Sequence, residues 1–544
     1  RGRASSLFWW EPTIRPTFDG VAQGPRTELN MHTRTRLVRT AAATCLMLVG
    51  TLAPTPGPIG AEAVEAQEVY DVVLMGGRVM DPETGLDAIR NVGIRGQTIV
   101  SISEGALQGT TVIDATGLVV APGFIDMHAH GQTVRANEFQ AMDGVTTALE
   151  LEGGVPSMTD FLDPRRGGSV LNFGASVSHG SARISVMPDF ADQYRQVRDI
   201  VDAAGTRDLT TEENAQIMEL IGAAAYEPLP KEQYGALRER LQSEITAGGL
   251  GIGMPHQYYP GANRDEIYRV MEFAGDNAIT IYTHVRSMGI DPIQEVIANS
   301  VATQAPLHIV HLNSSSLWDI ETNLDLIRGA RRAGVNVTTE AYPYTAASTS
   351  IESAIFDEGW QERLQISYGD LQWQETGERL TEATFNEYRE RGGVIIIHIM
   401  KPEWITAAMS DPAVMVASDG MPYDPGAHPR SAGTFARFLG RYVREEGTSS
   451  LMEGLRKITI MPAQRLGAVS AQMARKGRIQ IGSDADVTIF DPSKIIDTAT
   501  FEGTLSYSEG VQFVLVNGEF VVKDGALVDG ARPGRAIVGT RVVF

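Results

Sequence analysis

Eight short apolar runs follow one another along the central part of the chain, each succeeded by a polar or helical stretch. The first is "FIDMHAH" (124–130) and the last is "AVMVASDG" (413–420); between them come "GVTTALELE", "LNFGASVSH", "GGLGIGM", "AITIYTHV", "PLHIVHL" and "GVNVTTEAYPY". Connecting stretches such as "RDEIYRVMEFAGDN" carry apolar residues at helical spacing. Repeated strand–helix units predict a TIM-like (β/α)8 barrel over residues 124–465. A doubly wound open sheet is the alternative, but no glycine-rich phosphate loop follows the first strand to support it.

Two β-rich flanks enclose this central part. Residues 67–123 and 466–544 contain short apolar runs separated by turn residues, such as "YDVVLMGGRVMD" and "VQFVLVNGEFVVKDGALV". We expect them to pair into one small β-sandwich domain built from both chain ends. Residues 352–400 are interpreted as an insertion between the last two barrel strands, with helical pieces and one extra apolar run, "VIIIHIM".

The first 66 residues follow a different pattern. Met31 precedes three arginines between positions 34 and 39, the apolar run "AAATCLMLVGTLA" and the small residues of a possible cleavage site at "AEA". We interpret residues 31–66 as a signal peptide and residues 1–30 as an upstream extension that is not native. We therefore expect an exported protein, periplasmic or extracellular. An N-terminal membrane anchor is the alternative reading of this segment.

Composition narrows the possible partners and ligands. A formal net charge of −21 argues against nucleic acid or an anionic membrane surface as the main partner. The only cysteine, Cys45, lies in the apolar run of the predicted signal peptide. The mature chain would then have no thiol, so any metal must be held by histidines and carboxylates. No other run of apolar residues is long enough for a stable membrane anchor, and the oligomeric state stays open.

Histidines and carboxylates recur where the predicted barrel strands end. Because these ends converge on one mouth of a barrel, we expect an active site there. The residues concerned are His128, His130, Glu152, His179, His284, His311 and Asp419.

Spacing within the strands selects among these side chains. His128 and His130 share one face of a strand, so both can reach one metal ion. His308 and His311 are three apart and would face opposite ways. We choose His311, at the strand end, as the inward residue and assign His308 to packing.

Two glutamates compete for one role near the end of the second strand. Glu150 and Glu152 share a face one pleat apart. A single carboxylate is enough to bridge two metals. We prefer Glu152 because it lies nearer the mouth.

Several motifs carry a resemblance to a known family. "APGFIDMHAHG" resembles the first-strand signature of the amidohydrolase superfamily. "THVRSMG", "EAYPYTAAST" and "SDGMPYDPGAHPRSAGTFARFLGRYVRE" are similar to motifs of its D-aminoacylase (N-acyl-D-amino-acid deacylase) branch. The resemblance runs from Tyr70 to Ala536.

The resemblance implies a metal-dependent hydrolase of N-acyl-D-amino acids. It implies that His128 and His130 hold a more buried metal and that His284 and His311 hold a second. Asp419 would be a ligand and the proton shuttle. We expect one or two Zn²⁺ ions, while nitrogen and oxygen ligands would also accept Mn²⁺ or Co²⁺.

The chain departs from the branch at two places. The branch usually has a cysteine just after the second strand, where this chain has "ELEGG" with Gly153. Glu152, or Glu150, is the expected substitute; a carboxylated lysine is disfavoured because no lysine lies between the first strand and Lys231. The branch often has a lysine soon after the histidine that corresponds to His311, where this chain has Asn313.

Recognition of an amino-acid product requires a group that binds its carboxylate. Arg286 and Arg430 are candidates for a bidentate clamp, with structural ion pairs as the alternative for each. Tyr344 and Ser348 could donate to the carbonyl or the carboxylate. His179 could orient a ligand or contact substrate, or be structural.

Other functions remain open on the same barrel. The ligand set would also suit a dipeptidase, a cyclic-amide hydrolase or a lactonase. A remoter alternative is a non-catalytic periplasmic binding or scaffold protein.

Overall fold

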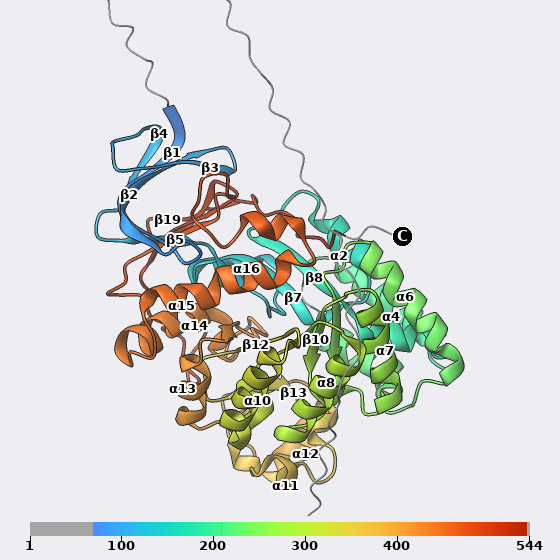
Figure 1. Ribbon diagram of the computed structural model, residues 1–544. Helices are drawn as coiled ribbons and strands as arrows, with labels where there is room; N and C mark the ends of the chain where they lie inside the picture. The colour runs from blue at the N-terminus through green and yellow to red at the C-terminus, as the bar shows by residue number, and fades with distance from the viewer. Residues whose placement is uncertain (1–68, 208, 541–544) are drawn as a thin grey trace, which may run out of the picture. The chain divides into compact units, whose positions relative to one another are not determined.

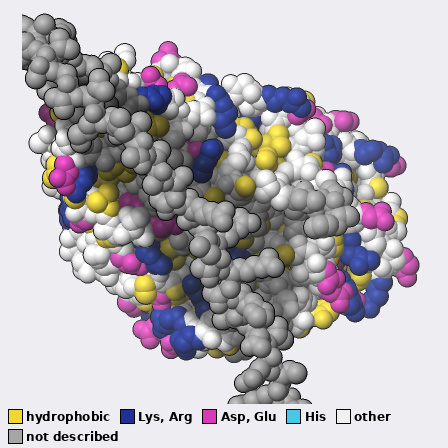
Figure 2. Space-filling model, turned by 45° about the horizontal axis from the view of Figure 1, so that its top comes forward, with side chains coloured by type: hydrophobic (Ala, Val, Ile, Leu, Met, Phe, Trp, Pro, Cys, Tyr) yellow, Lys and Arg dark blue, Asp and Glu magenta, His cyan; other side chains and the backbone are white. Residues whose placement is uncertain are grey.

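The computed structural model describes residues 69–207 and 209–540. The predicted extension (1–30), the predicted signal peptide (31–66) and Cys45 lie outside the described residues. Within the described ranges, no helix has both the length and the hydropathy of a membrane span. On the face shown in Figure 2, basic and acidic side chains are interspersed over the described surface.

Eight parallel strands form the central sheet. In spatial order they are β6 (Phe124–Asp126), β7 (Val145–Val155), β8 (Asn172–Ser178), β9 (Ile252–Pro255), β10 (Ile281–His284), β11 (Leu307–Ile309), β12 (Val337–Ala341) and β16 (Val414–Val416). A parallel bridge between Ala129 and Gly420 joins the two edges, and the backbone N–H of Asp419 donates to the carbonyl of His128 at 2.7 Å. The sheet therefore closes on itself, and the predicted (β/α)8 barrel is confirmed.

Side chains fill the inside of this barrel. Ile125, Leu149, Tyr282 and Met415, from four different strands, belong to one buried cluster. Met461 of α16 (Ile460–Gly467) joins the same cluster. The barrel is therefore a packed core, and polar chemistry is confined to its mouth.

Helices connect successive barrel strands and lie around them (Figure 1). In α7 (Arg264–Asp276), Asn263 caps the first turn, and Ile267, Val270 and Met271 repeat at helical spacing on the buried face. Further α-helices are α1 (Val134–Met142), α2 (Met158–Leu162), α3 (His179–Val186), α4 (Ala191–Ala204), α5 (Thr211–Ile221), α6 (Tyr234–Thr246), α8 (Ile290–Thr303), α9 (Leu312–Ser316), α10 (Ile320–Arg332), α13 (Pro402–Ser410), α14 (Arg430–Arg437) and α15 (Leu451–Ile458).

Strands from both ends of the described chain form a second, nine-stranded sheet. Its order is β20 (Ala526–Leu527), β19 (Glu519–Lys523), β18 (Val511–Val516), β17 (Val487–Phe490), β5 (Val119–Pro122), β1 (Val69–Asp81), β2 (Leu86–Arg95) and β3 (Thr98–Ser103), with β4 (Gln108–Asp114) also paired to β1. β5 runs antiparallel to β17, and Figure 1 shows the blue N-terminal strands beside red β19. Leu74, Val92, Val487 and Leu515 share its buried core. The expected pairing of both chain ends is observed, in one nine-stranded sheet.

A smaller antiparallel sheet lies in the segment between β12 and β16. It consists of β13 (Ala347–Ser350), β15 (Val394–Ile397) and β14 (Leu371–Trp373), accompanied by α11 (Trp360–Leu364) and α12 (Glu382–Arg391). Trp360, Trp373 and Phe385 are buried in its own apolar cluster. This segment supplies one wall of the pocket described below.

Candidate metal centre and active site

One group of polar side chains gathers at the C-terminal ends of β6, β7 and β16. His128 Nε2 lies 3.1 Å from His130 Nε2 and 3.2 Å from Glu152 Oε2. Both Nε2 atoms lie 3.4 Å from Oδ1 of Asp419. One ligand atom of each residue lies within 4.8 Å of the others. Such convergence of imidazole nitrogens and carboxylate oxygens is the donor set of a divalent transition-metal site.

A second group shares Glu152 with the first. Glu152 Oε1 lies 2.8 Å from His284 Nδ1 and 3.0 Å from His311 Nε2. The two imidazole nitrogens are 3.0 Å apart. Burial raises the pKa of the Glu152 carboxyl, but the surrounding imidazoles outweigh burial and hold that pKa well below its usual range. Glu152 thus presents one oxygen to each histidine pair, as a bridging carboxylate would.

Glu150 lies behind this centre. Its Oε2 is 2.7 Å from Nδ1 of His130, the ring nitrogen that faces away from the group. Its Oε1 accepts hydrogen bonds from the backbone N–H groups of Gly153 and Gly154. The geometry makes Glu150 an orienting partner of His130 and favours Glu152 as the shared ligand.

Glu340 of β12 was missed at the sequence level. Its Oε1 lies 3.0 Å from His128 Nδ1 and accepts from the backbone N–H of His311 at 2.7 Å. Its Oε2 contacts Nε2 of His308. Burial raises the pKa of Glu340, yet His308 and His128 lower it to about 2. Glu340 sits at a strand end like the ligands, so the rule that selected them could also have found it.

The alternation argument for His308 and His311 was wrong. β11 ends at Ile309, and His311 has a left-handed backbone with φ 31°. Alternation therefore does not extend to His311. Both histidines are linked to the centre, His311 directly and His308 through Glu340.

Asp419 is held from two sides. Its Oδ2 is 2.7 Å from Nη1 of Arg430, while Oδ1 faces His128 and His130. Burial raises the pKa of the Asp419 carboxyl, but the charges of Arg430 and His128 hold it well below its usual range. The carboxylate is therefore ionised and oriented by its guanidinium partner.

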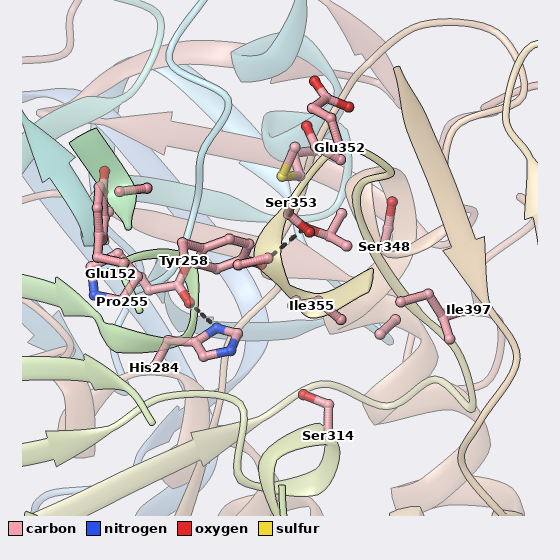
Figure 3. A pocket seen from close by; sticks show the side chains of 18 of the residues that line it. Glu152, Pro255, Tyr258, His284, Ser314, Ser348, Glu352, Ser353, Ile355 and Ile397 are labelled. Atoms are coloured by element: carbon pink, nitrogen blue, oxygen red, sulfur yellow. Dashed lines mark hydrogen bonds and ion pairs between the residues drawn. The ribbon is translucent and has the colours of Figure 1, made fainter. Parts of the chain in front are cut away.

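The centre opens into a pocket of about 530 Å³. His130, Glu152, His284, His311 and Asp419 form its polar end. Figure 3 shows Glu152 and His284 at one side, Ser348, Ile355 and Ile397 at the other, and Tyr258 between them. No lysine or arginine is among the described residues that line it.

The chain matches the amidohydrolase family over residues 111–522. It belongs to this family. The D-aminoacylase of Alcaligenes xylosoxydans xylosoxydans is 28% identical over 509 residues, which cover 87% of this chain and 98% of that protein. The N-acyl-D-glutamate deacylase of the same organism is 28% identical over 499 residues, covering 87% and 97%.

A solved structure agrees with these sequence matches. The N-acyl-D-glutamate deacylase of Bordetella bronchiseptica, complexed with zinc and a phosphonate inhibitor, superposes with a TM-score of 0.70 at 25% identity. The match covers 87% of this chain and 100% of that chain. The resemblance to the D-aminoacylase branch is confirmed, and with it the prediction of a hydrolase acting on amide bonds.

Three of the predicted substrate-binding residues of this amidohydrolase do not line the pocket. Arg286 pairs with Glu295 at 3.2 Å and donates to the carbonyl of Ala262. His179 Nε2 lies 3.0 Å from Glu266, which also binds Arg183. The Tyr344 hydroxyl donates to Asp497 at 3.1 Å. All three are occupied by structural partners.

Of the remaining two predicted residues, one lines the pocket and the other does not. Ser348 lines it directly. Arg430 lies behind Asp419, where its guanidinium donates to the carbonyl of Ser348 and stacks 4.7 Å from the ring centroid of Tyr342. Tyr342, which was not predicted, lines the pocket and is the first tyrosine of the "EAYPY" motif.

Proposed function

We propose that this amidohydrolase cleaves N-acyl-D-amino acids to a carboxylate and a free D-amino acid. Relatives named D-aminoacylase, N-acyl-D-glutamate deacylase and N-acyl-D-aspartate deacylase support the proposal. The observation that carries it is the position of Glu152, which presents one oxygen to each of two histidine pairs beside Asp419.

The residues present fit one or two divalent cations. His128 and His130 would hold one and His284 and His311 the other, with Glu152 shared and Asp419 completing the first group. We propose Zn²⁺, while Mn²⁺ or Co²⁺ would suit the same nitrogen and oxygen donors. A cation bound there polarises the substrate carbonyl and lowers the pKa of a water molecule.

Asp419 is placed to move the proton. Arg430 fixes Oδ2, so Oδ1 faces the reacting end of the pocket. Oδ1 takes a proton from the attacking water and later delivers it to the nitrogen of the leaving amine. The same carboxylate thus serves as base and then as acid.

We propose that the amino-acid carboxylate of the substrate binds on the side of the mouth that follows β12. Within the described residues, the buried hydroxyl of Ser348 has no hydrogen-bond partner, and that of Tyr342 has only Ser314 and Arg430 beside it. A buried hydroxyl without a partner is unfavourable, and a bound carboxylate would satisfy Ser348 and could also accept from Tyr342. The nearby guanidinium of Arg430 adds positive charge.

We also propose that the protein is exported, periplasmic or extracellular. The sequence pattern of residues 31–66, with its arginines, apolar run and small residues at the expected cleavage site, supports export. Fractionation of expressing cells with N-terminal sequencing tests it. A retained residue 31 in a cytoplasmic fraction would overturn it.

One experiment tests the deacylase assignment. The purified protein is analysed for metal and assayed with N-acetyl-D-amino acids, their L forms, dipeptides and cyclic amides. We expect at least one divalent metal per chain, loss of activity on chelation, recovery with Zn²⁺ and a preference for D substrates. Preferred hydrolysis of a cyclic amide or an L substrate would contradict it.

A further inference from the structure

The pocket extends well beyond the reacting end into an apolar arm. We define the apolar arm as Ile184 of α3, Ile217 and Ile221 of α5, and Gly222 and Ala225 of the short helix η2 (Gly222–Ala225), all of which line the pocket. None of these side chains carries a charge or a hydrogen-bonding group. The pocket volume of about 530 Å³ lies within the range of about 300 to 1,000 Å³ that buries ligands of drug size. An acetyl group at the reacting end would therefore leave this arm unfilled.

Barrel topology gives the direction of the arm. The proposed carboxylate site follows β12, whereas α3, α5 and η2 lie in the connection between β8 and β9. β8 is four strands from β12 in the closed eight-stranded order, so the two lie on opposite sides of the mouth. With the carboxylate at Ser348 and the amide at the metal end, the acyl group points toward the arm.

The outer end of the arm is apolar and partly open. Met218 and Tyr226 line the pocket with 43% and 47% of their surface exposed. The Tyr226 hydroxyl donates to Asp357 at 3.1 Å, and Arg389 holds the same carboxylate at 2.9 Å. Asp357 and Arg389 belong to the segment between β12 and β16, whose outer part therefore reaches across the mouth to the rim of the arm.

We propose that the apolar arm binds a straight acyl chain several carbons longer than acetyl. The proposal rests on the proposed deacylase function and specifies its substrate class as N-acyl-D-amino acids with a medium-length fatty acyl group. The reaction remains hydrolysis, in which the amide C–N bond breaks and water supplies the oxygen of the fatty acid and a proton of the amine. Each methylene buried in the arm adds favourable transfer free energy.

Gly222 offers a way to fill the arm with little strain. It has helical backbone angles, φ −55° and ψ −39°, and a Cβ there would meet only the flexible end of Met218 at 3.3 Å. Gly222→Leu therefore adds a side chain beside the arm. Gly235→Leu on α6 is the matched control, because Gly235 is exposed and a Cβ there meets nothing within 4 Å.

The test measures kcat/KM for acetyl, butyryl, hexanoyl and octanoyl derivatives of D-leucine. We expect kcat/KM to rise at least about tenfold along the series. Gly222→Leu should lower the octanoyl-to-acetyl ratio about tenfold, and Gly235→Leu should leave it unchanged. A flat or falling series, or an equal loss for both substrates in Gly222→Leu, would overturn the proposal.

A binding measurement separates this proposal from the deacylase assignment. Calorimetric titration of the Asp419→Asn variant with the same compounds reports binding in the arm without turnover. Tighter binding of longer chains without hydrolysis of any would retain the arm and overturn the deacylase. Hydrolysis of the acetyl compound without a gain in affinity along the series would retain the deacylase and overturn the arm.

Discussion

The two ends of the pocket are built in opposite ways. At the metal end, the functional side chains lie at the ends of several parallel strands and contact side chains from other strands, as Glu152 contacts His128, His284 and His311. At the other end, the walls come from α5, η2 and the segment between β12 and β16 and are mostly apolar. Changes at the first end should therefore abolish turnover, whereas changes at the second should redistribute turnover among substrates.

Replacing Asp419 should have the largest effect on turnover. Asp419→Asn keeps the shape but cannot take a proton, so we expect kcat to fall about 10²- to 10⁴-fold. Steady-state kinetics measure the loss, and circular dichroism with metal analysis shows whether fold and metal content persist. Near-normal kcat would refute the proton role.

A paired replacement separates the two glutamates of β7. Glu152→Ala removes an oxygen from each histidine pair, so bound metal should fall to half or less, with activity lost. Glu150→Gln removes the carboxylate charge beside His130 Nδ1 but keeps an oxygen for the backbone N–H groups of Gly153 and Gly154, so it should retain metal stoichiometry while weakening affinity about 10- to 100-fold. Metal analysis after dialysis distinguishes them. Unchanged metal in Glu152→Ala would move the bridging role to Glu150.

Glu340 tests how far the metal end depends on residues behind it. Glu340→Gln should weaken metal affinity about 10- to 100-fold in competition titrations, because the imidazole of His128 loses its carboxylate partner. Glu352→Gln is the control, since Glu352 lines the pocket but bonds only the backbone of Gly393. Equal affinity in the two variants would exclude an orienting role for Glu340.

The lowered pKa of Glu340 also predicts that the free energy of unfolding depends on pH in the acid range. The pKa of Glu340 is about 2 in the folded chain, below its ordinary value of 4.5. Ionised Glu340 therefore contributes stability above pH 4.5, and this contribution is lost as the pH falls toward 2. Denaturant unfolding of the metal-free protein across this range should show a shallower fall in Glu340→Gln.

The contrast between the ends also explains what the sequence could predict. His128, His130, His284 and Asp419 lie at strand ends, and periodicity alone locates strand ends in a barrel. The apolar arm depends instead on how the long β8–β9 connection packs over the mouth, which no local pattern encodes. For Arg286 the sequence left a carboxylate clamp and a structural ion pair open, and the structure shows an ion pair with Glu295 just beyond the end of β10 at His284.

At the substrate end, Ser348→Ala should have a moderate effect. Loss of one hydroxyl that we assign to the carboxylate should raise KM about three- to tenfold with little change in kcat. The measurement compares N-acetyl-D-leucine with its amide, which lacks the charge. An equal change for both compounds would place Ser348 elsewhere in recognition.

Arg286→Gln should have the smallest effect, and it tests whether proximity in sequence to a ligand implies a role in binding. Arg286 is bonded to Glu295 and Ala262 and does not line the pocket, so KM should stay within about twofold of the wild type. Loss of this partly exposed ion pair should lower stability by about 1 kcal/mol or less in denaturant unfolding. A rise in KM as large as that of Ser348→Ala would mean that Arg286 leaves Glu295 to meet the substrate. Recognition of the carboxylate would then come from the β10 side of the mouth, and the acyl chain would have to point away from the apolar arm.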